Sequence, residues 1–329
     1  MFRLSILFLM LCLSCSEHKP EQKVENRKNK KVVIAHRGAS GYLPEHTLPA
    51  KAMAYAMGAD YLEQDIVLSK DDVPIVIHDI HLETVTDVVI KFPEKKRKDG
   101  KYYAIDFTFE ELKQLNVSER FDPETNEAVF PGRFPIFTST FKLHSLQEEI
   151  EFIQGLNKST GKNIGIYPEI KEPAFHQKEG KDISKIVLEI LNNNGYKTKN
   201  DPCILQCFDA KELKRIRNEF KSELFLVQLM EFKTDEKLEE IVTYADGIGP
   251  WVYQIIEGKD KNGKWKISNL VANAHKLHLK VHAYTLRADQ LGDFNSFEGL
   301  LQVALNEANV DGIFTDFPDK AVWFIDKKQ

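Results

Sequence analysis

Ionisable side chains stand at the ends of three successive apolar segments early in the chain. The segment "VVIAHRG" ends in His36 and Arg37, "YLEQDIVL" carries Glu63 and Asp65 two residues apart, and "VPIVIHD" reaches His78. Residues two apart on a strand point to the same face, so the two carboxylates can act on one ligand. Histidine suits acid–base catalysis because its unperturbed pKa lies near neutrality. The pattern predicts a site that combines proton transfer with cation binding.

A later segment, "YPEIK", adds a carboxylate and a positively charged side chain from another strand, Glu169 and Lys171. Three carboxylates without cysteine ligands suit a hard divalent cation, Ca²⁺ or Mg²⁺, better than structural zinc. Arg37 and Lys171 can hold a phosphate anion, and arginine offers two parallel donors. The alternative interpretation is a set of surface acids and ordinary salt-bridge partners. Because several such groups fall at strand ends, a ligand-binding site is the favoured interpretation.

Two histidines on either side of a phosphorus centre can divide the proton transfers between them. One takes a proton from the attacking oxygen, and the other gives one to the leaving alkoxide. His36 and His78 are the candidates for these roles. A lone histidine at a strand end is more often only a hydrogen-bonded polar residue. To that class we assign His46, His81, His144, His176, His275 and His278.

Short apolar runs alternate with helical patterns along the chain, which is typical of βα units around a parallel sheet. We predict a TIM-type (β/α)8 barrel, in which segment 74–78 forms a hairpin with its neighbour or continues the wall. An open doubly wound sheet is the alternative. Active sites of such barrels lie at the carboxyl ends of the strands, where the candidate side chains fall. We expect strands near 32–36, 61–67, 74–78, 164–170, 203–208, 224–229, 246–249, 280–285 and 311–315, and helices near 47–57, 146–157, 182–194, 209–220, 235–243, 268–278, 297–308 and 318–325.

The chain divides into a leader, a tether and one large domain. Residues 1–15 are typical of a signal peptide of the lipoprotein type, with Cys15 as the lipidated residue and ordinary cleavage as the alternative. Residues 16–31 have almost no apolar side chains and predict a disordered tether. The domain covers 32–327, and an insertion at about 86–144, rich in Pro, Gly and aromatic residues, predicts a small cap over one barrel mouth. We expect the protein in the bacterial cell envelope, in the periplasm, lipid-anchored to a membrane.

Composition limits the partners. Hydrophobic residues make up 42% of the 329 residues, enough for a full core, and the formal net charge is −5. The chain has no excess of basic residues, so it lacks the positive charge that is typical of nucleic-acid-binding proteins. The expected partner is a small molecule, with membrane contact only through the N-terminal anchor. The oligomeric state is left open.

The motifs HRG, ExD, HD and PEIK, in this order, resemble those of the glycerophosphodiester phosphodiesterases, specifically the periplasmic bacterial type that prefers calcium. The resemblance runs from "VVIAHRGASGYLPEHTLPA" to "GIFTDFPDKAV", nearly all of the chain after the tether. It implies a TIM-type barrel with a segment inserted after the second barrel strand. Asn commonly stands in the wider family at the position of His46, and Pro usually stands in this type at Ala283.

The same resemblance implies a reaction, the metal-dependent hydrolysis of glycerophosphocholine, glycerophosphoethanolamine and similar diesters to sn-glycerol 3-phosphate and an alcohol. Either water attacks directly, or the neighbouring glycerol hydroxyl attacks first to give a cyclic phosphate. The alternatives are a phospholipase D-like lipid phosphodiesterase and a surface-exposed binding lipoprotein. The implied roles are His36 and His78 as the acid–base pair, Glu63, Asp65 and Glu169 as ligands of Ca²⁺ with Mg²⁺ less expected, Arg37 and Lys171 on the phosphate, and Gln206, Phe208 and Tyr284 along the pocket.

Overall fold

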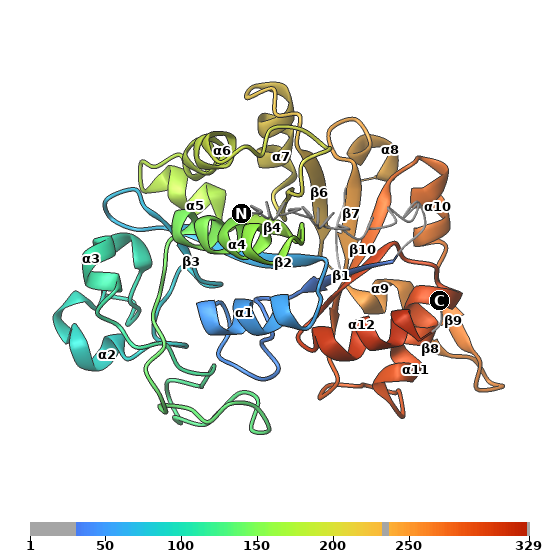
Figure 1. Cartoon of the computed structure of the whole chain (residues 1–329), viewed down its shortest axis with the longest axis horizontal. Helices are drawn as coiled ribbons and strands as arrows, with labels where there is room; N and C mark the ends of the chain where they lie inside the picture. The colour runs from blue at the N-terminus through green and yellow to red at the C-terminus, as the bar shows by residue number, and fades with distance from the viewer. Residues whose placement is uncertain (1–30, 232–236, 328–329) are drawn as a thin grey trace, which may run out of the picture. The chain divides into compact units, whose positions relative to one another are not determined.

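Eight parallel strands close into a barrel within residues 31–231 and 237–327, the part of the chain that the computed structural model describes (Figure 1). The first strand pairs in parallel with both the second and the last strand, which closes the ring and confirms the TIM-type fold. A ninth strand, β3 (Pro74–Val76), pairs antiparallel with β2 outside the ring. The barrel strands are β1 (Val32–Ala35), β2 (Tyr61–Leu68), β4 (Gly165–Ile170), β5 (Ile204–Cys207), β6 (Phe225–Met230), β7 (Gly247–Pro250), β10 (Lys280–Leu286) and β11 (Gly312–Thr315).

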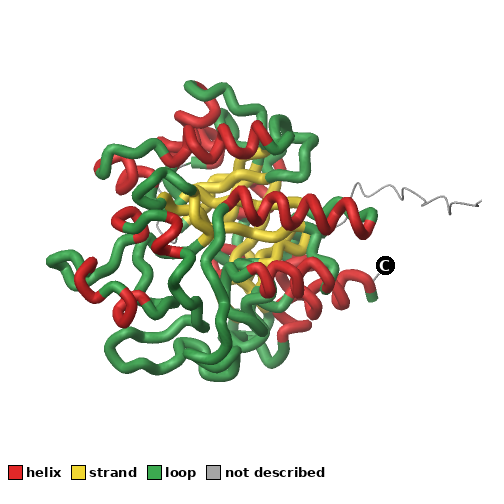
Figure 2. Tube along the Cα trace, turned by 60° about the vertical axis from the view of Figure 1, so that its left-hand side comes forward, coloured by secondary structure: helices red, strands yellow, loops and turns green. Residues whose placement is uncertain are grey.

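Helices surround the barrel, and Figure 2 shows the strands gathered inside them. Local sequence sets where the longest helix begins and ends. Ser145 and Glu148 satisfy each other's backbone N–H groups in a capping box, and Gly161 ends the helix with a φ of +71°. The surrounding helices are α1 (Leu48–Ala56), α4 (Leu146–Thr160), α5 (Pro173–Lys178), α6 (Ile183–Asn193), α7 (Ala210–Asn218), α8 (Leu238–Ile241), α9 (Val252–Ile255), α10 (Leu270–Lys276), α11 (Phe297–Gln302), which continues as a π-helical turn to Glu307, and α12 (Pro318–Asp326).

Apolar side chains fill the inside of the barrel. Tyr167 from β4 packs edge-on against Phe314 from β11, with ring centroids 5.0 Å apart. The hydroxyl of Tyr167 also lies 2.9 Å from Nδ1 of His282, so this buried polar pair is satisfied within the core. Ile34, Ile204 and Val227 complete the cluster. The barrel is therefore a packed core, and space for a ligand is left at its mouth.

The inserted segment has a hydrophobic core of its own beside β3, and Figure 1 shows it in teal and green at one side of the barrel. It contains the short helices α2 (Val88–Lys91) and α3 (Phe109–Leu112) and two 3₁₀ helices, Pro93–Lys95 and Ala104–Asp106, joined by turns and irregular segments. A capping box of Thr108 and Glu111 begins α3. Two of its arginines, Arg120 and Arg133, bind Asp79 and Asp316 at the barrel mouth.

The hairpin of β8 (Ile256–Lys259) and β9 (Trp265–Ile267) is absent from the sequence-based expectations. Trp265 of this hairpin stacks on Phe294 with ring centroids 3.8 Å apart. A local sequence pattern does not reveal such a contact with a residue farther along the chain. The short helices α5 and α9 were likewise not expected.

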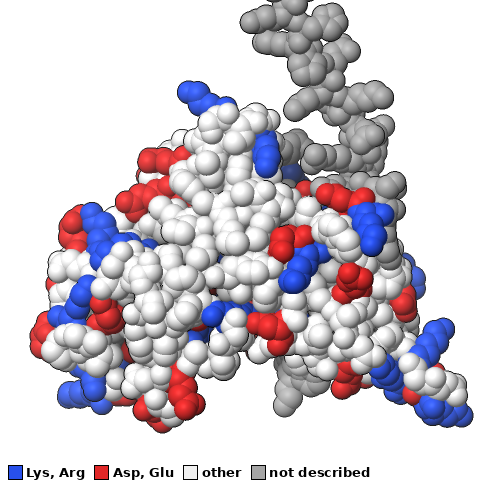
Figure 3. Space-filling view, turned by 60° about the horizontal axis from the view of Figure 1, so that its bottom comes forward, with Lys and Arg blue, Asp and Glu red and all other residues white. Residues whose placement is uncertain are grey.

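The signal peptide, Cys15 and residues 16–30 of the tether lie outside the described residues. Among the residues that are described, no helix has both the length and the apolar character that crossing a membrane requires. Basic and acidic side chains are interspersed over most of the face drawn in Figure 3. That face shows no extended field of one sign.

Candidate active site

A cavity of about 180 Å³ opens where the carboxyl ends of the barrel strands meet their loops. All ten residues predicted from the sequence to act on a ligand line it, although they come from six different places in the chain. Trp251 and Arg287 also line it and were not expected. The predicted residues are His36, Arg37, Glu63, Asp65, His78, Glu169, Lys171, Gln206, Phe208 and Tyr284.

His36 follows β1 and is held by a carboxylate from the end of β11. Its Nδ1 lies 2.6 Å from Oδ1 of Asp316. Burial and the nearby charge of Arg37 lower the pKa of His36 to about 4. Burial would raise the pKa of Asp316, but contacts with His36 and two arginines hold it well below its usual range. The pair is therefore a neutral imidazole on an ionised aspartate, and Nε2 is the nitrogen left for chemistry.

His78, at the end of the segment after β3, repeats this arrangement. Its Nδ1 lies 2.6 Å from Oδ1 of Asp79. Burial, with the charges of Arg37 and Lys171, lowers the pKa of His78 to about 4. Nε2 of His78 carries no hydrogen bond within the described residues, whereas Nε2 of His36 accepts one from Nε of Arg37 over 3.2 Å. In both histidines Nε2 is the nitrogen that no aspartate binds. Two aspartate-backed imidazoles can serve as a general base and a general acid.

Three carboxylates lie side by side on neighbouring strands. Glu63 and Asp65 on β2 are each 1% exposed, and Asp65 pairs in register with Glu169 on β4. Oε1 of Glu169 accepts a bond from Lys171 Nζ over 2.8 Å. Burial, together with the negative charge of Asp65, raises the pKa of Glu63 well above its usual value and that of Glu169 to about 8.

This cluster fits a hard divalent cation. Oδ1 of Asp65 is buried and has no hydrogen-bond partner in the described part of the chain, although Lys171 Nζ lies 3.7 Å away. The donors on offer are carboxylate oxygens, with no thiolate among them. Lys171 pairs with Glu169, and Nε of Arg37 lies 3.5 Å from Oδ2 of Asp65, so two cationic side chains face three buried acids. A bound cation would complete the charge balance.

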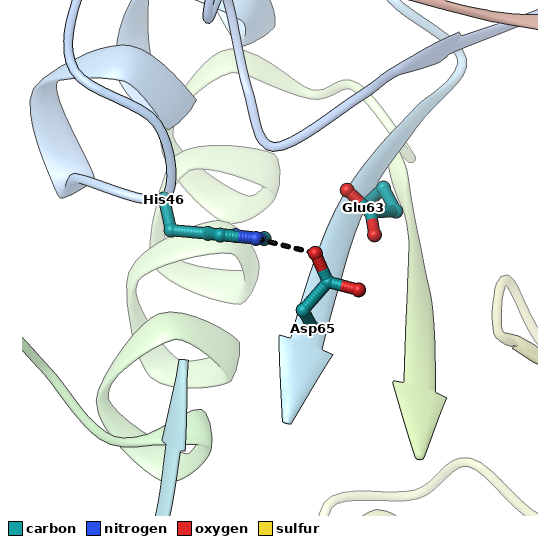
Figure 4. A group of neighbouring side chains, drawn as sticks. All are labelled: His46, Glu63 and Asp65. Atoms are coloured by element: carbon teal, nitrogen blue, oxygen red, sulfur yellow. Dashed lines mark hydrogen bonds and ion pairs between the residues drawn. The ribbon is translucent and has the colours of Figure 1, made fainter. Parts of the chain in front are cut away.

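His46 belongs to the same cluster, which corrects its assignment to the ordinary histidines. Its Nε2 lies 2.8 Å from Oδ2 of Asp65, and Figure 4 shows the ring pointing at that carboxylate beside Glu63. One ligand atom from each of these three residues falls within 4.8 Å of the other two, which makes them a possible metal-binding group. The sequence signal for this position is that a histidine stands where the family commonly has Asn.

The turn after β1 aims Arg37 into the cavity. Arg37 has a φ of +60°, which a non-glycine residue adopts rarely and chiefly at functional sites. Its backbone N–H donates to Oε2 of Glu63 over 2.6 Å, and its Nη1 lies 3.0 Å from Oε2 of Glu45. Glu63 thus holds the backbone of Arg37, and Glu45 holds its guanidinium, whose Nε donates to Nε2 of His36.

Aromatic side chains form the outer wall of the cavity. Phe208 and Tyr284 meet edge-on with ring centroids 5.9 Å apart, and Trp251 lies next to them in the lining. The hydroxyl of Tyr284 donates to the carbonyl oxygen of Met230 over 2.8 Å, which fixes the ring. Oε1 of Gln206 is buried without a hydrogen-bond partner among the described residues, so it can accept a bond from a ligand.

A second cavity of about 230 Å³ adjoins the first on the side of the inserted segment. The two cavities share His36, Arg37, His78 and Arg287, so these four residues form a neck between them. Two guanidinium groups and two imidazoles line this neck, which suits a phosphate diester with one alcohol on either side. Sequence reasoning missed Arg287 and the cap residues Arg120 and Arg133, which also line the second cavity, because isolated arginines have no diagnostic spacing.

Comparison with known proteins identifies the family of this chain. The model of the glycerophosphoryl diester phosphodiesterase family matches residues 36–320. The glycerophosphodiester phosphodiesterase of Haemophilus influenzae is 42% identical, over 98% of this chain and 97% of its own, and that of Treponema pallidum is 37% identical, over 91% and 93%.

Two solved structures share the fold. A phosphodiesterase of Oleispira antarctica, determined with its product sn-glycerol-3-phosphate, superposes with a TM-score of 0.64 at 21% identity, over 90% of this chain and 97% of that one. A glycerophosphodiester phosphodiesterase from Agrobacterium tumefaciens gives a TM-score of 0.60 at 19% identity, over 89% and 99%. The match to the family model covers most of the domain and the relatives cover nearly the whole chain, so the chain belongs to the glycerophosphoryl diester phosphodiesterase family.

Proposed function

We propose that this protein hydrolyses glycerophosphodiesters, such as glycerophosphocholine and glycerophosphoethanolamine, to sn-glycerol 3-phosphate and the free alcohol. The observation that carries the proposal is the neck between the two cavities. There the aspartate-backed His36 and His78 stand beside Arg37, with the buried carboxylates on one side. The names of the family and of its full-length relatives support the same substrate class.

The two histidines would carry the protons. Each donates its Nδ1–H to an aspartate, which leaves Nε2 for the reacting oxygens. At His36 the substrate would replace the bond that Nε2 accepts from Nε of Arg37. One imidazole takes the proton of the attacking oxygen, and the other, protonated, gives a proton to the leaving alkoxide. The low pKa of both groups describes the protein without substrate. A phosphate anion between them favours the charged form of one imidazole, which supplies the acid.

Glu63, Asp65 and Glu169 would hold the cation, with His46 orienting Asp65 or joining the ligands. The cation we propose is Ca²⁺, which accepts several carboxylates in a flexible geometry, whereas Mg²⁺ demands a near-ideal octahedron. When bound, the cation supplies a fixed positive charge to the phosphoryl oxygens in the transition state.

The charged side chains Arg37 and Lys171 would bind the phosphate. Lys171 is anchored to Glu169, so its ammonium group remains beside the carboxylates. Gln206, Phe208 and Tyr284 would line the space for one alcohol of the diester, since they form the wall of the first cavity. No charged side chain is dedicated to a choline or ethanolamine group in this lining, so we expect kcat/KM to vary less than about tenfold between these leaving alcohols, the size of a 1.4 kcal/mol difference.

The first residues would place the enzyme at a membrane. We propose that residues 1–15 are a lipoprotein signal peptide, that Cys15 carries the lipid, and that 16–31 tether the domain in the periplasm. The apolar run in the leader and the polar composition that follows it support this proposal. Cys15→Ser should release the protein from the membrane fraction of bacterial cells, and a variant that remains there would contradict the lipid anchor.

The reaction is tested on protein from Ser16 onward, stripped with a chelator and mixed with glycerophosphocholine. Release of sn-glycerol 3-phosphate is followed before and after addition of Ca²⁺, Mg²⁺ or Zn²⁺. We expect Ca²⁺ to restore release. Folded protein that releases none with any of the three cations would refute the proposal. Lysophospholipid, assayed alongside, should not be cleaved, and its preferential cleavage would favour a lipid phosphodiesterase instead.

A further inference from the structure

Each of the two histidines is connected to the inserted segment through its aspartate. Oδ2 of Asp79 lies 2.7 Å from Nη1 of Arg120, and Oδ2 of Asp316 lies 2.7 Å from Nη2 of Arg133. Both arginines belong to the cap, whereas the aspartates belong to the barrel. We propose that Arg120 and Arg133 are positioning residues for the acid–base pair, so that the cap completes the catalytic site. This inference rests on the proposed function.

Arg120 serves two of the groups around the neck. Besides Asp79, it binds Glu45, with Nη2 2.6 Å from Oε1 and Nε 3.1 Å from Oε2. Glu45 in turn binds Arg37, the guanidinium that we place on the phosphate. The side chain of Arg120 is 16% exposed. A single cap residue thereby supports both the acid–base group His78, through Asp79, and the phosphate-binding group.

Arg133 serves the other histidine, and it has a partner in this task. Its side chain is 4% exposed, and besides Asp316 it binds Asp289 over 2.8 Å and the carbonyl oxygen of Ser40 over 3.2 Å. Asp316 also accepts a bond from Nε of Arg287 over 2.7 Å. Loss of Arg133 therefore leaves one guanidinium on Asp316, whereas loss of Arg120 leaves none on Asp79.

The geometry explains why these contacts matter for chemistry. A carboxylate bound at one oxygen by imidazole Nδ1–H and at the other by a guanidinium cannot rotate freely. It therefore keeps the ring in one tautomer and one orientation. The pair of Arg133 and Asp316 is buried, and the pair of Arg120 and Asp79 is partly buried, with Asp79 26% exposed. Fully exposed pairs, in contrast, contribute little. Without its arginine, the aspartate would hold the imidazole less firmly, and Nε2 would depart from the line of proton transfer.

A purely structural role for these arginines predicts a different result. Arg97 provides the matched control, because it lies in the same insertion and also makes two ion pairs, with Asp106 at 2.7 Å and Glu179 at 3.0 Å. Neither acid touches a histidine of the site. If the cap arginines act only as anchors, then substituting Arg97 and substituting Arg120 should alter stability in the same way and leave kcat unaffected.

The experiment compares Arg97→Ala, Arg120→Ala, Arg120→Lys and Arg133→Ala with the unmodified protein, in excess Ca²⁺ on glycerophosphocholine. We expect Arg120→Ala to lower kcat by about 10- to 100-fold, the usual effect of losing a group that orients a functional histidine. It should also raise KM, because Arg37 loses support. Arg133→Ala should lower kcat less and leave KM nearly unchanged. Arg97→Ala should lower only the melting temperature.

Two further readouts separate positioning from folding. Arg120→Lys keeps the charge but loses the planar fork, so it should fold and still lose part of kcat. Added guanidinium ion, below denaturing concentrations, should restore turnover to Arg120→Ala and have no such effect on His78→Ala. Undiminished kcat in Arg120→Ala and Arg120→Lys, when the unmodified protein is active, would overturn this inference alone. An inactive unmodified protein would overturn the proposed function.

Discussion

The backbone N–H of Arg37 donates a hydrogen bond to Glu63 Oε2 over 2.6 Å. One turn therefore joins the guanidinium proposed for the phosphate to a carboxylate proposed for the cation. That turn requires an unusual backbone, with φ at +60° for Arg37 and +89° for Gly38. The spacing between the anion-binding and cation-binding groups thus depends on the local conformation that follows β1.

Substitution of Gly38 should test this dependence. A Cβ at Gly38 would lie 2.8 Å from the backbone carbon of Ala50, in addition to the cost of a positive φ. We expect Gly38→Ala to lower the free energy of unfolding by about 2–5 kcal/mol, as strain and overpacking add, and to weaken substrate binding. Chemical denaturation measures the first effect and KM the second. Gly58→Ala is the control, because it has a similar φ of +87° but no atom closer than 3.7 Å.

Removal of either catalytic imidazole should abolish most turnover without unfolding the protein. For His36→Ala and His78→Ala we expect kcat to fall by about 10²- to 10⁴-fold, the range of general acid–base catalysis. Calorimetric binding of Ca²⁺ should persist, since neither residue belongs to the carboxylate cluster. His275→Ala, at a surface pair with Asp311, should retain full activity. Normal turnover in either histidine variant with metal bound would contradict the assignment.

The pH profile of kcat/KM should reveal the depressed histidine pKa values. Burial and the charge of Arg37 lower the pKa of both His36 and His78 to about 4, so the neutral base form persists well below the usual 6.5. In saturating Ca²⁺, the acid limb of the kcat/KM profile, where the general base becomes protonated, should therefore lie near pH 4. In Arg37→Gln the acid limb should shift to higher pH, since a positive charge is gone. An acid limb near 6.5 in the unmodified protein would refute the first expectation.

Metal removal should destabilise the protein as well as inactivate it. Three buried carboxylates face Lys171 and Arg37, so a bound cation relieves the repulsion that remains between them and stabilises the folded protein as its concentration rises above its Kd. We expect a chelator to lower the melting temperature of the unmodified protein and to have little effect on Glu169→Gln. Calorimetry should show weaker Ca²⁺ binding by that variant. Glu172→Gln, an exposed neighbour, should bind Ca²⁺ normally.

Much of the site could be predicted because a barrel converts sequence order into spatial convergence. Glu63 and Asp65 share a face through the two-residue period of a strand, and Glu169 joins them through the register of β2 and β4. His36 and His78 follow apolar segments whose ends meet at the same mouth. Regular strands fix the positions of these side chains, so local sequence patterns were enough to predict them.

The residues that sequence reasoning missed are positioned by tertiary contacts. Arg120 and Arg133 lie in irregular turns of the cap, where no periodicity shows which direction a side chain takes. Asp316 follows a strand that the sequence predicts, but its bond to His36 joins residues 280 positions apart, which no local pattern reveals. His46 reaches the carboxylate cluster because its backbone has a φ of +60°, and the amino-acid sequence around it does not predict this conformation.

The bond between His36 and Asp316 has a consequence for the order of events in the life of the molecule. The histidine follows the first strand and the aspartate follows the last, and they meet only because β1 pairs with β11. A growing or shortened chain that lacks the final strand holds every motif from HRG to PEIK and yet has an unsupported base. The acid–base site is therefore complete only after the barrel closes, and we expect a chain without its last strand to be inactive.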